Sequence, residues 1–182
     1  KTLDNLPDKV AIHINDTHPA LVVPELMRIL TDEYFYTWDR AWDIVTKTVS
    51  YTNHTVMPEA LEKWNEDLFR LKLPRIYSIV REINERFCSD AWQAFPGCWD
   101  KISSLAVIAN SQVRMANLSV IGSNSVNGVS KLHSDILKAS TFKDFYKMYP
   151  LKFRNVTNGI AHRRWLNASN PKLASLLDEC IG

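Results

Sequence analysis

The alternation of short β-rich runs with long amphipathic helical patterns constrains this chain more than any other feature. A β-rich run at residues 9–15 leads into a helical pattern with one apolar stripe, and a second such pattern starts at about residue 37. The same step recurs after a β-rich run at residues 49–53. Parallel strands need long crossover connections, which are usually helices. The sequence therefore predicts the α/β class, with a parallel sheet that helices cover on both faces.

The second half of the chain continues this alternation. Its longest helical pattern runs from Pro74 to Phe95 and stops at Pro96-Gly97, because proline and glycine interrupt helices. Residues 98–112 give no clear pattern. The remaining expected elements are a strand at 115–121, a loop at 122–128 followed by a helix, a strand at 153–157 and a helix at 171–180.

Composition excludes two classes of partner. Of the 182 residues, 46% are apolar and 23% charged, which is typical of a globular domain with a substantial core. The 22 basic and 20 acidic side chains are intermixed, and a net charge of +2 creates no field that would attract nucleic acid. No stretch approaches the roughly 18 consecutive apolar residues that a membrane span needs. We therefore expect neither a nucleic acid nor a membrane as partner.

The cysteines and the first residues bear on the protein's context. Cys88, Cys98 and Cys180 are odd in number and widely spaced, which predicts reduced thiols in a cytoplasmic protein and no metal site. Lys1–Asp4 contain neither a methionine nor a secretion signal. We expect the chain to be a segment of a longer protein.

Polar loops at strand ends are where function is sought in such a fold, because ligands of parallel sheets bind outside the carboxyl ends of the strands. In the first of these loops, Asp16 and His18 suit sugar hydroxyls, a metal or proton transfer. Their spacing alone favours a simpler role, in which Asp16 or Thr17 caps the following helix. His13, in the middle of the expected strand, is predicted to be an interior histidine.

The second loop combines Asn53-His54-Thr55 with Pro58-Glu59. An amide, an imidazole, a hydroxyl and a carboxylate together suit a hydroxyl-rich ligand such as a carbohydrate. The same residues equally fit a turn followed by the first turn of a helix, where Pro58 presets the backbone and Glu59 complements the helix dipole. The residues alone do not decide between these interpretations.

The last two loops carry weaker signals. The loop at 122–128 matches neither the dinucleotide fingerprint nor the phosphate-binding P-loop, and His133 in the helix after it is predicted to be interior. Asn158 precedes Arg163-Arg164, whose guanidinium groups suit phosphate, although a solvated helix face beside a buried Trp165 is the commoner arrangement. Taken alone, these patterns predict an α/β domain with polar strand-end loops.

Four longer motifs, in this order, closely resemble the glycogen and maltodextrin phosphorylase family. They are Asn15-Asp-Thr-His-Pro19, Tyr51-Thr-Asn-His-Thr55 through Pro58-Glu-Ala-Leu-Glu62, Val126-Asn-Gly-Val-Ser-Lys-Leu-His-Ser134, and Thr157-Asn-Gly-Ile160 with Arg163-Arg-Trp165. Ala161-His162 departs from the Thr-Pro of many members. The resemblance extends over nearly the whole chain and is weakest at about residues 98–112.

The resemblance implies an α-1,4-glucan phosphorylase, in which orthophosphate cleaves the terminal glucosyl residue of glycogen, starch or maltodextrin and yields glucose 1-phosphate. It implies two Rossmann-like domains of the GT-B type, with residues 1–160 the later part of the N-terminal domain and 161–182 the crossover into the C-terminal domain. Pyridoxal phosphate is bound in this family by a lysine of the C-terminal domain, so we expect no cofactor-binding residue here. The whole enzyme is expected to be a homodimer, and this chain alone to be inactive.

The resemblance also assigns roles to residues. His54 matches the residue that contacts the transferred glucose near the developing positive charge, and Thr55 lies beside the phosphate; these two are the expected catalytic residues. The expected sugar-binding residues are Asp16, His18, Glu59 and Asn158. Two alternatives remain at this point, a non-catalytic glucan-binding or structural domain and a related glycosyltransferase that uses a sugar nucleotide.

Overall fold

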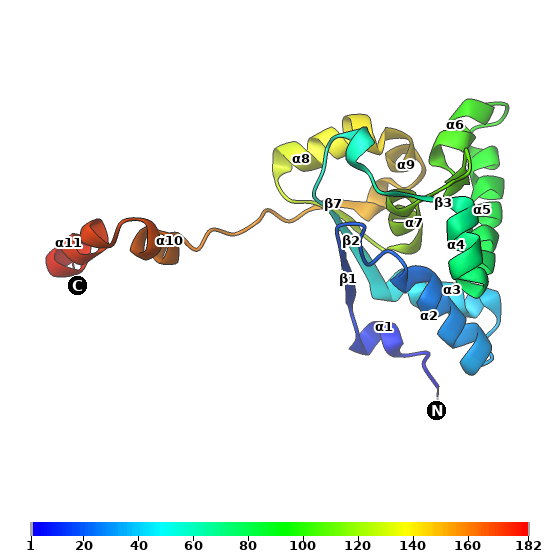
Figure 1. The fold of residues 1–182 in the computed structure, drawn as a ribbon, viewed down its shortest axis with the longest axis horizontal. Coiled ribbons are helices and arrows are strands. Elements are labelled where there is room, and N and C mark those ends of the chain that lie inside the picture. Colours follow the sequence, from blue (N-terminus) through cyan, green and yellow to red (C-terminus); the bar gives the residue numbers. More distant parts are fainter. Residues whose placement is uncertain (1, 182) are drawn as a thin grey trace.

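Four parallel strands form the main sheet (Figure 1). In the computed structural model, which describes residues 2–181, the strands lie side by side in chain order: β1 (Ile12–Asn15), β2 (Val49–Asn53), β6 (Val126–Gly128) and β7 (Phe153–Asn155). All three pairings are parallel. The predicted α/β class is confirmed.

Helices occupy the connections between strands. The long helices expected from the apolar stripes are present, because those stripes face the core. The α-helices are α1 (Leu6–Lys9), α2 (Val22–Arg28), α3 (Trp38–Thr48), α4 (Glu66–Lys72), α5 (Pro74–Ala94), α6 (Trp99–Leu105), α7 (Met115–Gly122), α8 (Lys131–Ile136), α9 (Lys143–Met148), α10 (His162–Ser169) and α11 (Pro171–Ile181). Shorter turns are the π-helical η1 (Ile29–Glu33) and η3 (Leu137–Thr141) and the 3₁₀ turns η2 (Pro58–Ala60) and η4 (Pro150–Lys152).

The connecting helices pack against one face of the main sheet. That face carries Ile14, Tyr51, Val126 and Phe153 in register, and all four side chains are buried in the core. Because every new strand adds to the same edge and crossovers are right-handed, successive helices fall on the same side. The expectation of helices on both faces is therefore wrong for residues 2–181.

The opposite face of the sheet is polar. Its register-matched side chains are His13, Asn15, Ser50, Thr52, Asn127 and Arg154. His13 is exposed on this face, with its Nε2 2.7 Å from Thr52 Oγ1. The prediction of an interior histidine is wrong, because alternation along β1 places Ile14 inward and His13 outward.

Helix α7 occupies the segment where a strand was expected. All eight of its residues are buried, and a helix buried on every side lacks the apolar stripe by which helices are recognised in a sequence. The strand predicted at residues 115–121 is therefore wrong. Asn117 of this helix donates from Nδ2 to the carbonyls of Ser104, Leu105 and Ala106 and so satisfies the end of α6.

A second sheet joins the end of the poorly patterned segment to residues 63–65. Strands β3 (Lys63–Asn65), β5 (Gln112–Arg114) and β4 (Ile108–Ala109) pair antiparallel in that order. Asn110 and Ser111 form the turn between β4 and β5, both with positive φ. Strands of two or three residues are too short to show an alternating pattern, which is why the sequence did not predict this sheet.

The last two helices lie apart from the sheet (Figure 1). The irregular segment after β7 leads to α10 and α11, which contact each other. Trp165 is 57% exposed, so the expected burial of this residue is wrong. Several apolar side chains of α11 are also exposed, namely Leu173, Leu176, Leu177 and Ile181.

None of the helices within residues 2–181 combines the length and apolar character needed to cross a bilayer.

Lys152 closes the carboxyl end of α7. Its ammonium group donates to the carbonyls of Val120 and Ile121 at 3.3 and 3.0 Å and lies 4.8 Å from the centre of the Tyr149 ring. Burial lowers the pKa of Lys152 to about 8, because desolvation disfavours the charged form. The side chain therefore satisfies helix carbonyls while retaining a charge that is costly to bury.

This burial predicts a pH dependence of stability. Between pH 8 and the ordinary lysine pKa of 10.5, the unfolded chain binds more protons than the folded one, so the free energy of unfolding should rise with pH. From pH 8 to pH 9.5 we expect Lys152 to contribute a rise of about 1–2 kcal/mol, measured by urea unfolding. Lys152→Met removes the titrating group, and an identical pH profile in that variant would contradict the prediction.

Candidate functional site

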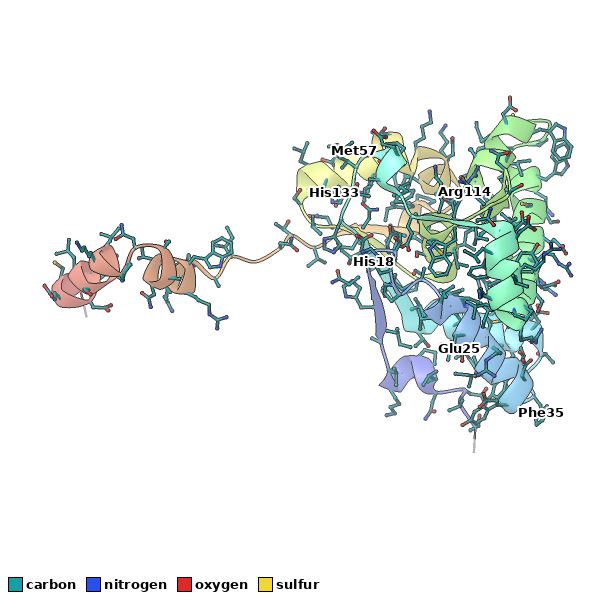
Figure 2. All side chains as sticks on the ribbon, viewed as in Figure 1. His18, Glu25, Phe35, Met57, Arg114 and His133 are labelled. Carbon is teal, nitrogen blue, oxygen red and sulfur yellow. The ribbon has the colours of Figure 1, made fainter. Side chains whose placement is uncertain are left out.

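The carboxyl ends of the four parallel strands meet at one edge of the sheet. The segments that leave this edge begin at Asp16, His54, Val129 and Val156. Figure 2 shows His18, Met57 and His133 along this part of the molecule. The prediction of a loop at residues 122–128 is wrong, because Val126–Gly128 form strand β6. The strand-end segment begins only after Gly128.

Asp16, His18 and Glu62 form a polar cluster at the end of β1. His18 Nε2 lies 3.7 Å from Asp16 Oδ2, and His18 Nδ1 lies 3.6 Å from Glu62 Oε2. Thr17 Oγ1 and Trp64 Nε1 donate to the two oxygens of Glu62 at 2.7 and 2.9 Å. The His18 side chain is 77% exposed. The cluster thus presents an accessible imidazole between two carboxylates, a surface suited to hydroxyl groups.

The backbone at Asp16 contradicts helix capping. Helix α2 begins only at Val22 and receives no side-chain cap, so the predicted capping by Asp16 or Thr17 is wrong. Asp16 instead has a φ of 63°, a left-handed conformation that few residues other than glycine adopt. Its Oδ1 accepts from Thr17 N at 2.7 Å, a local bond of the kind that lets aspartate tolerate this backbone.

His54 is oriented by the neighbouring strand. Its Nε2 donates to Asn15 Oδ1 at 2.6 Å, which leaves Nδ1 and the rest of the exposed ring free to meet a ligand. Asn15 is the last residue of β1, so its position is fixed by pairing with Thr52 of β2. Sequence patterns alone indicate no role for Asn15, although it is the first residue of the first motif.

A buried polar network lies beneath His54 and Thr55. Asn53, which is fully buried, accepts from Thr55 N at 2.9 Å and donates to Tyr51 Oη at 2.9 Å. His133 Nε2 lies 3.1 Å from Asn53 Oδ1 and 3.3 Å from the Thr55 carbonyl. Burial raises the pKa of the Tyr51 phenol well above its usual range. The interior position predicted for His133 is confirmed.

Asn158 joins the site from the end of β7. Its N–H donates to the Val129 carbonyl at 3.0 Å. An open hollow of about 460 Å³ lies at this edge on the polar face of the sheet. Its lining includes Asn15, His54, Asn127, Thr157 and Asn158. The second and fourth motifs therefore share one concave surface although they are about 100 residues apart in the chain.

The expected site residues lie at different places along this edge of the structure. His54 and Asn158 share the hollow, and Asp16 and His18 form the cluster with Glu62. Glu59 lies exposed in η2 and is not part of the hollow's lining within residues 2–181. Glu62 is the last residue of the second motif, and the sequence predicted no role for it. Its place in the cluster is known only from its contacts with Thr17 and His18.

The lining offers no attachment point for an aldehyde cofactor. No lysine borders the hollow in the described part of the chain, and Lys152 is occupied with the carbonyls of α7. Residues 2–181 likewise contain no group of three or more side chains placed to hold a metal ion. The lining of this hollow thus supplies hydrogen-bonding groups for a polar ligand.

Comparison with known proteins is consistent with this geometry. A family model for carbohydrate phosphorylases matches residues 1–182. The chain is similar to glycogen phosphorylase of Bacillus subtilis (strain 168), with 56% identity over 100% of this chain and 23% of that protein. It is similar to the human muscle form of glycogen phosphorylase, with 51% identity over 98% of this chain and 22% of that protein. The chain thus spans less than a quarter of the length of these relatives.

The junction between β6 and α8 predicts a stability effect. A Cβ on Gly128 would lie 2.4 Å from Ser134 Oγ and 2.8 Å from Ser134 N, and the backbone atom cannot move aside. We expect Gly128→Ala to lower the free energy of unfolding by about 1–3 kcal/mol, measured by urea unfolding. Gly159→Ala is the matched control, because nothing lies within 4 Å of its Cβ position; equal losses in both variants would contradict the prediction.

Proposed function

The chain belongs to the carbohydrate phosphorylase family, and on that premise we propose that it is part of an α-1,4-glucan phosphorylase. In the proposed reaction, the bond between the anomeric carbon of the terminal glucosyl residue and the bridging oxygen breaks. An orthophosphate oxygen bonds to that carbon, and the bridging oxygen leaves with a proton as the new chain end. The products are glucose 1-phosphate and a glucan shortened by one residue.

One observation carries this proposal. His54 and Asn158, from two motifs far apart in the chain, line the same hollow at the carboxyl edge of the sheet. An imidazole and an amide that face one concave surface can read the hydroxyl groups of a single sugar residue. The cluster of Asp16, His18 and Glu62 lies at the end of the adjacent strand, which suits contacts with the next sugars.

We assign the residues accordingly. His54 contacts the transferred glucose near the positive charge that develops at its anomeric carbon, and the Asn15 bond fixes the direction of its ring. Thr55 lies beside the phosphate, and Asn158 holds the same glucose. The sugars on the acceptor side contact Asp16, His18 and Glu59. Hydrogen bonds of this kind raise the rate when they strengthen in the transition state.

The domain organisation, cofactor and oligomeric state of the whole enzyme follow from the same assignment. Residues 1–160 belong to the N-terminal domain of a GT-B enzyme and 161–182 to the crossover, which accords with the separation of α10 and α11 from the sheet (Figure 1). Pyridoxal phosphate would be held by a lysine of the C-terminal domain and would supply a phosphate group for proton transfer. The whole enzyme is a homodimer in the cytoplasm, where the free thiols of Cys88, Cys98 and Cys180 stay reduced.

The two alternatives are less well supported. Relatives at more than 50% identity across nearly the whole chain carry the name glycogen phosphorylase, which disfavours a purely structural or glucan-binding domain. A glycosyltransferase that uses a sugar nucleotide is disfavoured by the family match. The 182 residues alone contain one side of the site, so we expect catalysis only from the full-length protein.

The activity is tested by phosphorolysis of maltoheptaose. The full-length protein with pyridoxal phosphate should release glucose 1-phosphate in proportion to added orthophosphate, whereas the 182-residue chain should release none. Omission of orthophosphate is the control, because simple hydrolysis does not require it. If the full-length protein releases no glucose 1-phosphate, the proposed function is refuted.

The role of His54 is tested in the same assay. A sugar contact removed from a buried site costs about 1–3 kcal/mol, so His54→Ala in the full-length enzyme should lower kcat/KM by roughly 10- to 100-fold. His162→Ala is the matched control, since His162 is exposed on α10, away from the hollow, and should keep wild-type kinetics. Unchanged kinetics in His54→Ala would refute the assignment.

A further inference from the structure

His133 links the loop that carries His54 to Val129, the residue to which the Asn158 backbone is bonded. It is 8% exposed and lies in α8, whose start is fixed by a bond from His133 N to Ser130 Oγ. Its ring stands between the segment after β2 and the segment after β6. The reaction described above assigns this residue no part.

The hydrogen bonds of the ring define its tautomer. Val129 N donates to His133 Nδ1 at 3.1 Å, and a backbone N–H can only donate, so Nδ1 carries a lone pair. The proton is then on Nε2, which faces two acceptors, Asn53 Oδ1 at 3.1 Å and the Thr55 carbonyl at 3.3 Å. Both ring nitrogens are thus hydrogen-bonded, with Nδ1 as acceptor and Nε2 as donor.

Each of these bonds leads to a residue of the proposed site. The Thr55 carbonyl belongs to the loop that carries His54, and Val129, which donates to the ring, accepts from Asn158 N at 3.0 Å. One imidazole therefore fixes the backbone of Thr55 on one side and, through a single residue, the backbone of Asn158 on the other.

The loop after β2 depends on such side-chain bonds. Other segments reach it through Asn15 at His54, His133 at Thr55 and Thr141 Oγ1 at the Val56 carbonyl. Within residues 2–181, the side-chain hydrogen bonds of Asn15 and Thr141 reach only this loop, whereas those of His133 reach both the loop and Val129. Pairing of β2 with β6 ends at Asn53 and Gly128, so removal of the ring would take away the link between the two segments beyond that point.

We propose that His133 is a positioning residue of the phosphorylase, which holds the loops of His54 and Asn158 at the spacing that the transferred glucose requires. This inference rests on the proposed function. Small displacements of positioning groups cost rate rather than fold, since a shift of about 1 Å can lower a rate by 100-fold. The expected signature is a lower kcat with little change in the affinity for the outer sugars.

The test compares three variants of the full-length enzyme. His133→Leu removes the hydrogen bonds of the ring to Val129, Asn53 and Thr55 and should lower kcat by about 10- to 100-fold, with KM for maltoheptaose within about threefold of wild type. His133→Gln keeps one N–H donor and one acceptor and should recover part of kcat. Asn117→Leu is the control, because Asn117 is an equally buried polar residue that binds three carbonyls away from the hollow; it should lower the melting temperature and leave kcat unchanged.

Each outcome decides the question. Wild-type kcat in His133→Leu, or an equal loss of kcat in Asn117→Leu, overturns the positioning role. If the wild-type enzyme shows no phosphorolysis, the proposed function fails, and calorimetric titration with D-glucose then tests the geometry by itself. Weaker glucose binding in His133→Leu than in Asn117→Leu supports the bridge between the two loops, and equal binding in both overturns it.

Discussion

The parallel pairing of β1, β2, β6 and β7 in chain order is the constraint on which the other features depend. Parallel strands all end at the same edge, so four segments scattered between residues 16 and 158 are brought together there. Growth of the sheet at one edge, combined with right-handed crossovers, also places the connecting helices on one face. The polar face and the polar edge therefore adjoin each other, and the hollow lies where they meet.

The helical layer requires that buried backbone ends be satisfied. Helix α7 is enclosed on every side, and its final carbonyls are reached by the Lys152 ammonium group while its Asn117 amide serves the end of α6. Buried carbonyls left without donors cost free energy, and these two side chains remove that cost. Ser123, just beyond α7, is the exception within the described residues, because its buried hydroxyl has no partner.

The carboxyl edge of the sheet combines a buried hydrogen-bond network with exposed side chains. Asn53, Tyr51 and His133 form a buried network under the loop of Thr55, whereas His54 and His18 remain accessible to a ligand. Side chains of β1 and α8, namely Asn15 and His133, hold the loop of His54 and Thr55, and a backbone bond to Val129 holds Asn158. This division suits a site that is pre-organised and yet open to a ligand.

The amino-acid sequence was enough to predict the α/β class, the long amphipathic helices, the first, second and last strands of the main sheet, and the strand-end loops that contain His54 and Asn158. These follow from local periodicity and motif spacing, which a linear chain displays. Tertiary structure alone decided the helical state of residues 115–122, the antiparallel sheet at β3, β4 and β5, the outward position of His13, and the links made by Asn15, Glu62 and His133. Burial on all sides erases periodicity, and hydrogen bonds between residues 39 to 80 positions apart exist only once the sheet has brought their strands together.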